Sequence, residues 1–277
     1  MSTNGDDKSK KNPNAPKESK KTTREKAQVA REAAEAEQRR RDRRIRIIGG
    51  IAILAAVAII VGLGYWGSRK NSSTNSGSIV ADAALPTGAL AADNANAFGV
   101  PYKTTDGKPV LAIWEDFQCP VCGNFEKTMG AAVTKLADDG KVTVIHRPTT
   151  FLDQAHPESN SASARATAAW GCAIDAGKGE RYHNLLFANQ PSVEGTGWTD
   201  QQLMDFGTQA GITGDAATTF QKCYTDKTYT QWVTNSYLTF VNSAVAGTPT
   251  AFLNGKEVPA DTLTDATKLA ALIQSTT

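Results

Sequence analysis

Cys119 and Cys122 form the feature that most restricts how this 277-residue chain can fold. The apolar run before them, residues 110–118, is typical of a buried strand, and residues 123–137 have helical spacing. Cys119 is therefore predicted at a helix N-terminus, where free N–H groups and the helix dipole favour a thiolate. Such a position lowers a cysteine pKa from about 8.5 to roughly 3.5–7.5, which favours redox chemistry over half of a zinc site.

One apolar segment divides the charges of the chain. Residues 1–46 carry 15 Lys and Arg against 8 Asp and Glu, whereas residues 71–277 carry 13 against 20. Between them, residues 47–67 include no charge, and as a helix of about 31 Å they would cross a bilayer core of about 30 Å. The positive-inside rule predicts a single-pass membrane protein with a cytoplasmic N-terminus and an extracytoplasmic C-terminal part.

A cleaved signal peptide is the competing interpretation of this segment. Its leader would be unusually long and its apolar core would exceed the usual length of roughly 7–15 residues, so we favour an uncleaved anchor. The basic tail, residues 1–46, is expected to be partly disordered and to bind no nucleic acid, because no aromatic residue is interleaved with its charges. Residues 68–96 are predicted to be a flexible linker, which leaves residues 97–277 as one folded domain.

All four cysteines fall in the part assigned outside the membrane, where disulfide bonds persist. Cys119 and Cys122 lie one helical turn apart and can pair locally, which leaves Cys172 and Cys223, each within a predicted helix. We expect a structural disulfide between these two; two buried thiols and a second redox pair are the alternatives.

A metal site is not expected. The second pair of cysteines lacks the Cys-x-x-Cys spacing of a zinc site. His146, His156 and His183 are scattered in the sequence, and each is interpreted as structural or exposed rather than as a ligand. The chain is therefore predicted to need no metal and no cofactor.

The order of the remaining elements indicates the fold class. A β-branched strand, residues 142–146, follows the first helix, and helical patterns then dominate from 157 to about 245. Asn254-Gly255 between two extended runs is the strongest short hairpin pattern, and a last helix is expected over 261–274. This order predicts an α/β, thioredoxin-like fold with an all-helical insertion.

Thr248 and Pro249 stand directly before the first strand of the hairpin. In a thioredoxin-like fold this loop faces the Cys-x-x-Cys helix, where its backbone can bind an extended peptide. We expect a cis peptide bond before Pro249, since such bonds are kept at tight turns that serve a purpose.

The segments Asp116-Phe-Gln-Cys-Pro-Val-Cys122 and Val245-Ala-Gly-Thr-Pro-Thr250, with the helical insertion between them, resemble the DsbA-like thioredoxin family of thiol:disulfide oxidoreductases. The resemblance covers about residues 97–277, and the membrane-anchored extracytoplasmic form resembles those of Gram-positive actinobacteria. It implies that Cys119 and Cys122 introduce disulfide bonds into reduced, unfolded secreted proteins. It also implies a membrane quinone-linked reoxidant, such as a vitamin K epoxide reductase homologue. We expect the chain to act as a monomer.

Two positions depart from the family pattern. Many members carry an acid six residues before the first cysteine, able to shuttle the proton of the second sulfur, and here that position is Ile113. Glu115 lies on the same side of the strand and is either a substitute shuttle or a plain edge-of-strand carboxylate. Val121 replaces the His of strongly oxidising members, so a less oxidising couple is expected.

Two other functions use the same residues. A disulfide reductase or isomerase would share the site, although isomerases of this kind usually bring a dimerisation domain. A tethered, non-catalytic scaffold or metal carrier would use the Cys pair to bind an ion. Trp114, Phe117 and Phe125 are candidates for an apolar peptide groove, with core packing favoured for Trp114 and Phe125.

Overall fold

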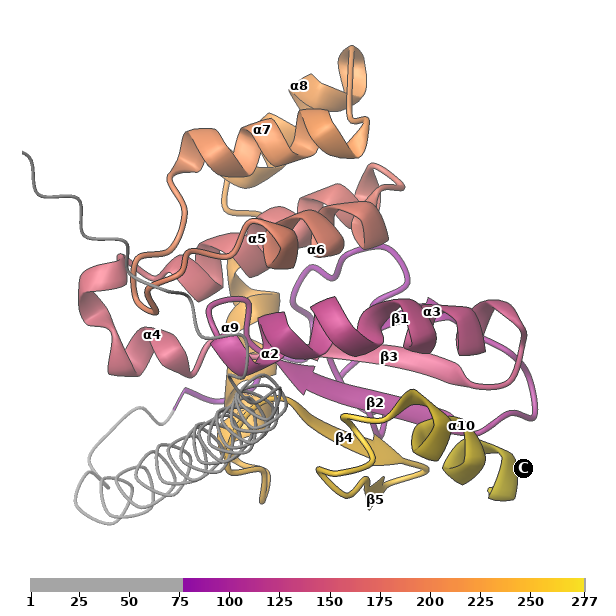
Figure 1. Cartoon of the computed structure of the whole chain (residues 1–277). Helices are drawn as coiled ribbons and strands as arrows, with labels where there is room; N and C mark the ends of the chain where they lie inside the picture. The colour runs from indigo at the N-terminus through magenta and orange to yellow at the C-terminus, as the bar shows by residue number, and fades with distance from the viewer. Residues whose placement is uncertain (1–76, 277) are drawn as a thin grey trace, which may run out of the picture. The chain divides into compact units, whose positions relative to one another are not determined.

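A five-stranded sheet with helices on both faces forms the centre of the computed structural model, which describes residues 77–276 (Figure 1). The strands lie in the order β1-β3-β2-β4-β5; β2 and β3 run parallel, and the other neighbouring pairs run antiparallel. The strands are β1 (Val100–Lys103), β2 (Val110–Glu115), β3 (Thr143–Pro148), β4 (Thr250–Leu253) and β5 (Lys256–Glu257).

The helices fall into three groups along the chain. The first follows the Cys pair and comprises α2 (Pro120–Phe125), a π-helical turn η1 (Glu126–Gly130) and α3 (Ala131–Asp138). The insertion comprises α4 (Leu152–Ala155), η2 (Pro157–Ser159), α5 (Ala162–Asp175), α6 (Gly179–Ala188), α7 (Asp200–Ala210), α8 (Asp215–Thr225) and α9 (Thr230–Val241). The last helix is α10 (Ala266–Ser275). The predicted order of strand, helix, strand, helical block, hairpin and helix is therefore confirmed.

Alternation along β2 explains how the sheet is covered on both faces. Leu111 and Ile113 are fully buried in a cluster with residues of α3 and α10. Trp114 points to the other face, where its ring lies 5.3 Å from that of Phe240 on α9. A strand buried on both faces reads as a continuous apolar run, which is the pattern that identified β2.

The structure corrects four local predictions. The strand β1 was not predicted, because its four residues include a proline and pair only at the sheet edge. The first helical run is interrupted by η1, and the connection after β3, expected to be irregular, includes α4. The last helix begins at Ala266 rather than 261, because the Asp265 side chain caps it by accepting from two backbone N–H groups.

The predicted linker is too long at its C-terminal end. Asn235 of α9 exchanges two hydrogen bonds with the backbone of Val80, at 3.1 and 2.8 Å, and Leu85 packs against the core of the insertion. The partner residues lie 155 positions away, so the Ser- and Ala-rich composition could not reveal these contacts.

The predicted tail, residues 1–46, the predicted transmembrane helix, residues 47–67, and the start of the linker lie outside the described residues. None of the helices within residues 77–276 combines the length and the apolarity that a membrane span requires.

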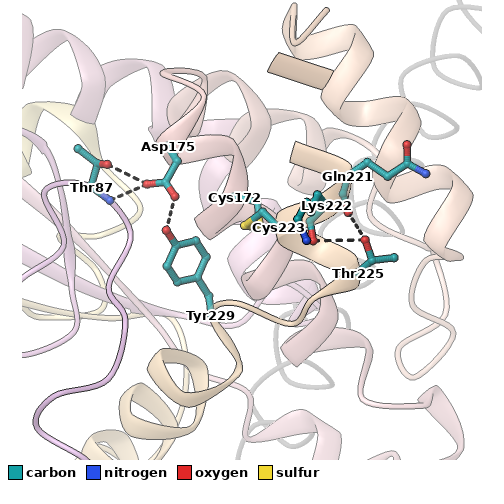
Figure 2. The surroundings of a disulfide bond; sticks show 8 residues. All are labelled: Thr87, Cys172, Asp175, Gln221, Lys222, Cys223, Thr225 and Tyr229. Carbon is teal, nitrogen blue, oxygen red and sulfur yellow. Dashed lines mark hydrogen bonds between the residues drawn. A yellow bond between two sulfur atoms is a disulfide. The ribbon is translucent and has the colours of Figure 1, made fainter. Parts of the chain in front are cut away.

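Cys172 of α5 and Cys223 of α8 form the disulfide bond expected of them, with Cα atoms 5.8 Å apart. Figure 2 shows Asp175 beside it, one turn after Cys172, accepting from the backbone N–H and the hydroxyl of Thr87 at 2.9 and 2.8 Å. The Tyr229 hydroxyl donates to the other Asp175 oxygen. The segment before β1 is thus attached to the insertion at the place where the disulfide joins two of its helices.

The disulfide should stabilise the domain without taking part in thiol exchange. It closes a loop with a sequence separation of 51, which corresponds to about 4 kcal/mol in the chain-entropy account. We expect the Cys172→Ala/Cys223→Ala variant to lose about 3–4 kcal/mol in the free energy of unfolding, measured in denaturant under oxidising conditions. An unchanged free energy of unfolding would contradict a stabilising role.

Candidate active site

Cys119 caps the first turn of α2. β2 ends at Glu115, and the Cys119 N–H donates to the Asp116 carbonyl at 2.9 Å, which closes the turn between strand and helix. Pro120 occupies the first helical position, where its missing N–H costs no hydrogen bond. The Cys119 carbonyl accepts from the Gly123 N–H at 3.0 Å, so the first helical bond fixes the sulfur at the helix N-terminus.

The two thiols of this turn have opposite electrostatic environments. Hydrogen bonding by the Cys122 thiol lowers the pKa of Cys119 to about 7, aided by Thr248 and by backbone N–H groups of the turn and opposed by burial. Burial raises the pKa of Cys122 well above its ordinary value, and its interaction with Cys119 raises it further. At neutral pH, Cys119 is therefore a partly ionised nucleophile and Cys122 a protonated thiol.

The loop before β4 lies against the first sulfur. The Thr248–Pro249 peptide bond is cis, and the Cys119 thiol donates to the Thr248 carbonyl at 3.4 Å. The Thr250 hydroxyl donates to the Gly247 carbonyl at 2.8 Å and steadies the loop where β4 begins. The structure thus joins in one site two motifs that are 129 residues apart in sequence.

The surface of the site is small and partly apolar. Val121, between the cysteines, is 51% exposed, whereas Cys122 is 1% exposed. Trp114, Phe117 and Phe125 are all buried in the core, so none of these three aromatic rings lines a groove. The prediction that Trp114 and Phe125 pack in the core is confirmed, and Phe117 packs there as well.

Gln190, which the sequence did not single out, ties the insertion to the active-site turn. Its amide donates to the Phe117 carbonyl at 2.8 Å and to the Cys119 carbonyl at 2.9 Å. Gly123 makes room for it, because a Cβ at that position would lie 2.3 Å from the Gln190 side-chain oxygen. A glutamine just after α6 has no local sequence pattern that reveals this role.

Asp116 is a buried structural acid of the same turn. Its carboxylate accepts from the Gln118 N–H at 2.9 Å, from the Ser163 hydroxyl at 2.5 Å and from the Leu152 N–H at 3.2 Å. Burial raises the pKa of Asp116 to about 8, although these hydrogen bonds oppose the rise. The carboxyl group therefore connects the turn to the starts of α4 and α5.

Glu115, the candidate proton shuttle, has partners other than Cys122. It is 1% exposed, so it is no ordinary edge-of-strand carboxylate. Its Oε1 atom lies 2.5 Å from His183 Nε2 and 3.1 Å from His146 Nδ1. Burial alone would raise the pKa of Glu115, but attraction to the two histidines lowers it to about 2. No hydrogen bond joins Glu115 to Cys122 among the described residues, and shuttling by Glu115 stays a prediction.

Two of the three histidines are close in space. His146 of β3 and the buried His183 of α6 have ring centroids 4.4 Å apart. Burial lowers the pKa of His183, but the Glu115 carboxylate outweighs it and raises the pKa to about 9. His156 lies apart from them and contacts Glu158 and Glu194 at 2.9 and 2.7 Å. The sequence places these two histidines 37 positions apart, and they become neighbours only because β3 and α6 meet in the folded chain.

The acidity of Cys119 can be measured by alkylation. We expect the rate of Cys119 modification by iodoacetamide to rise about tenfold per pH unit below pH 7 and to level off above it, since only the thiolate reacts. In Cys122→Ala the midpoint should move to higher pH, because the group that contributes most to lowering the pKa is lost. A wild-type midpoint near pH 9 would contradict the described environment.

Comparison with known proteins agrees with this geometry. The sequence profile of the family described as Thioredoxin matches residues 104–275. No curated protein sequence matches the chain.

Solved structures of thiol–disulfide oxidoreductases share the fold. The reduced disulfide bond oxidoreductase DsbG of Mycobacterium tuberculosis is 30% identical over 64% of this chain and 86% of its own, with a TM-score of 0.54. Oxidised DsbA of the same organism is 28% identical over 64% of this chain and 91% of its own, with a TM-score of 0.54. MdbA of Actinomyces oris, at 21% identity over 69% of this chain and 92% of its own, shares the fold with a TM-score of 0.57. The chain belongs to the thioredoxin family, within which it is a DsbA-like oxidoreductase.

Proposed function

We propose that this protein is a membrane-anchored extracytoplasmic oxidase that introduces disulfide bonds into reduced, unfolded secreted or cell-envelope proteins. The observation that carries the proposal is the contrast between the two thiols, since the Cys119 thiolate is stabilised and the Cys122 thiol is not. A stabilised Cys119 thiolate is a better leaving group and shifts the equilibrium toward the reduced enzyme, which is the direction that an oxidase requires.

The reaction begins from the Cys119–Cys122 disulfide. A substrate thiolate attacks Cys119 Sγ, a substrate–Cys119 disulfide forms, and Cys122 leaves as a thiolate that takes up a proton. A second substrate thiolate then attacks the substrate sulfur of this mixed disulfide, and Cys119 leaves as its stabilised thiolate. Two electrons have moved from the substrate to the enzyme, and the substrate holds a new disulfide bond.

The loop at Thr248 and Pro249 supplies the docking surface for the substrate chain. Both residues are partly exposed next to Cys119, and an extended peptide laid along the loop would bring its own sulfur to the site. The exposed Val121 offers an apolar contact without a hydrogen bond, which suits substrates of varied sequence.

The location and the partner follow from the charge pattern and from the chemistry. The net positive tail, the uncharged residues 47–67 and the net negative remainder support a cytoplasmic N-terminus and an extracytoplasmic domain. Because the cycle leaves the enzyme reduced, a membrane quinone-linked reoxidant, such as a vitamin K epoxide reductase homologue, would restore the disulfide. The protein acts as a monomer in this proposal.

The same site in a reductase or isomerase would pass electrons in the other direction. A protein named DsbA, from Mycobacterium tuberculosis, is among the similar structures in its oxidised and its reduced form, which supports the oxidase. Val121 adds no charge or hydrogen bond to the Cys119 thiolate, and a pKa of about 7 is less depressed than the roughly 3.5 of DsbA. We therefore propose a moderate oxidant rather than a strong one.

Oxidation of a reduced, unfolded protein carrying two thiols tests the proposal. Oxidised wild-type protein should convert the substrate dithiol to a disulfide, whereas Cys119→Ser and Cys122→Ser, which cannot form the Cys119–Cys122 disulfide, should each abolish the conversion. Cys172→Ala/Cys223→Ala serves as the cysteine control and should stay active at temperatures where it is folded. Undiminished oxidation by Cys119→Ser would refute the mechanism.

A further inference from the structure

Four ionisable side chains converge behind the active-site turn. They come from the end of β2, from η1, from β3 and from α6, and one potential ligand atom of each lies within 4.8 Å of those of the others. We propose that Glu115, Glu126, His146 and His183 bind a divalent transition metal ion, with Zn²⁺ as the preferred ion.

The local backbone directs Glu126 toward this cluster. Glu126 opens the π-helical turn η1, and π-helical turns inside helices are frequent at functional sites. Gly130 at the end of the turn leaves the space that the carboxylate fills, because a Cβ there would lie 2.7 Å from Glu126 Oε2.

Polar atoms of the cluster are buried without partners. Glu115 Oε2 and His146 Nδ1 are both inaccessible to solvent and accept or donate no hydrogen bond within residues 77–276. His146 Nδ1 approaches Glu115 Oε1 to 3.1 Å, but out of line for a hydrogen bond. An unpaired buried carboxylate oxygen is costly, and a bound cation would satisfy it together with the imidazole nitrogen.

The donor set matches zinc chemistry. Two imidazole nitrogens and two carboxylate oxygens form a four-coordinate set that suits Zn²⁺, and the two carboxylates balance its charge. In a tetrahedral site with bonds of about 2.0–2.2 Å, neighbouring ligand atoms lie about 3.4 Å apart. The potential ligand atoms of the cluster already lie within 4.8 Å of one another. Side-chain rotations that shorten these distances would therefore close the cluster around an ion.

A cavity gives an ion access to the cluster. It has a volume of about 220 Å³, is partly open to solvent, and has Glu126, His146 and His183 in its wall beside Trp170 and Asn184. An entry path and a mostly preformed donor set are what a metal site requires of the apoprotein.

Zinc binding is tested on the full-length protein in its oxidised form, in which Cys119 and Cys122 cannot act as thiolate ligands. We expect one Zn²⁺ per chain by isothermal titration and by metal analysis after gel filtration. Glu115→Gln and His183→Ala should each weaken binding by about 100-fold or more. His156→Ala, which removes a histidine outside the cluster, is the matched control and should bind as the wild type does.

Cobalt substitution identifies the ligands independently. Co²⁺ should give the visible absorption of a four-coordinate nitrogen and oxygen site, without a thiolate charge-transfer band. Far-UV circular dichroism verifies that each variant is folded. If His183→Ala does not fold, His146→Gln takes its place, because His146 is only half-buried. Any of three results would overturn the proposal: less than one zinc ion per chain, unchanged binding in the cluster variants, or a thiolate charge-transfer band. The cluster would then be a metal-free network of carboxylates and histidines.

Discussion

The contact of the Cys119 sulfur with the Thr248 loop is the constraint on which the site depends. Backbone N–H groups of the helix N-terminus lie on one side of the Cys119 sulfur. The Thr248 carbonyl, which contacts it on the other side, belongs to a segment 129 residues later. The antiparallel pairing of β2 with β4 brings it there, because Trp114 lies opposite Thr250 in the register. A shift of one residue in this pairing would turn the loop's neighbours to the other face of the sheet and separate the two motifs.

The helical insertion completes the turn from the opposite side. Gln190 holds the carbonyls of Phe117 and Cys119, and Ser163 holds the Asp116 carboxylate. The disulfide between α5 and α8 restrains the block from which these side chains come. The insertion therefore does more than enlarge the domain, since it fixes the backbone of the turn that carries both sulfurs.

The parts of this arrangement that depend on local pattern could be predicted from the sequence. The strand and helix around Cys119, the hairpin at Asn254-Gly255, and the helices of Cys172 and Cys223 follow from short-range periodicity and turn chemistry. By contrast, Gln190 hydrogen-bonds across 71 residues or more, and Glu115 meets His183 across 68.

Contacts of this kind produce no periodic pattern in the sequence, so the proximity of His146 and His183 could not be predicted from it. Glu115 was singled out from the position of the family's acid together with strand alternation, and neither revealed its histidine partners. The short edge strand β1 was missed because an edge position imposes little pattern on its residues.

The reduction potential of the Cys119–Cys122 couple tests the central claim, that this site donates disulfide bonds, most directly. Equilibration of the full-length protein with glutathione buffers, followed by alkylation and mass spectrometry, gives its value. The account predicts a potential between the strong oxidant limit of about −120 mV and the thioredoxin value of about −270 mV. A potential at or below about −270 mV would contradict it, because such a couple is a reductant.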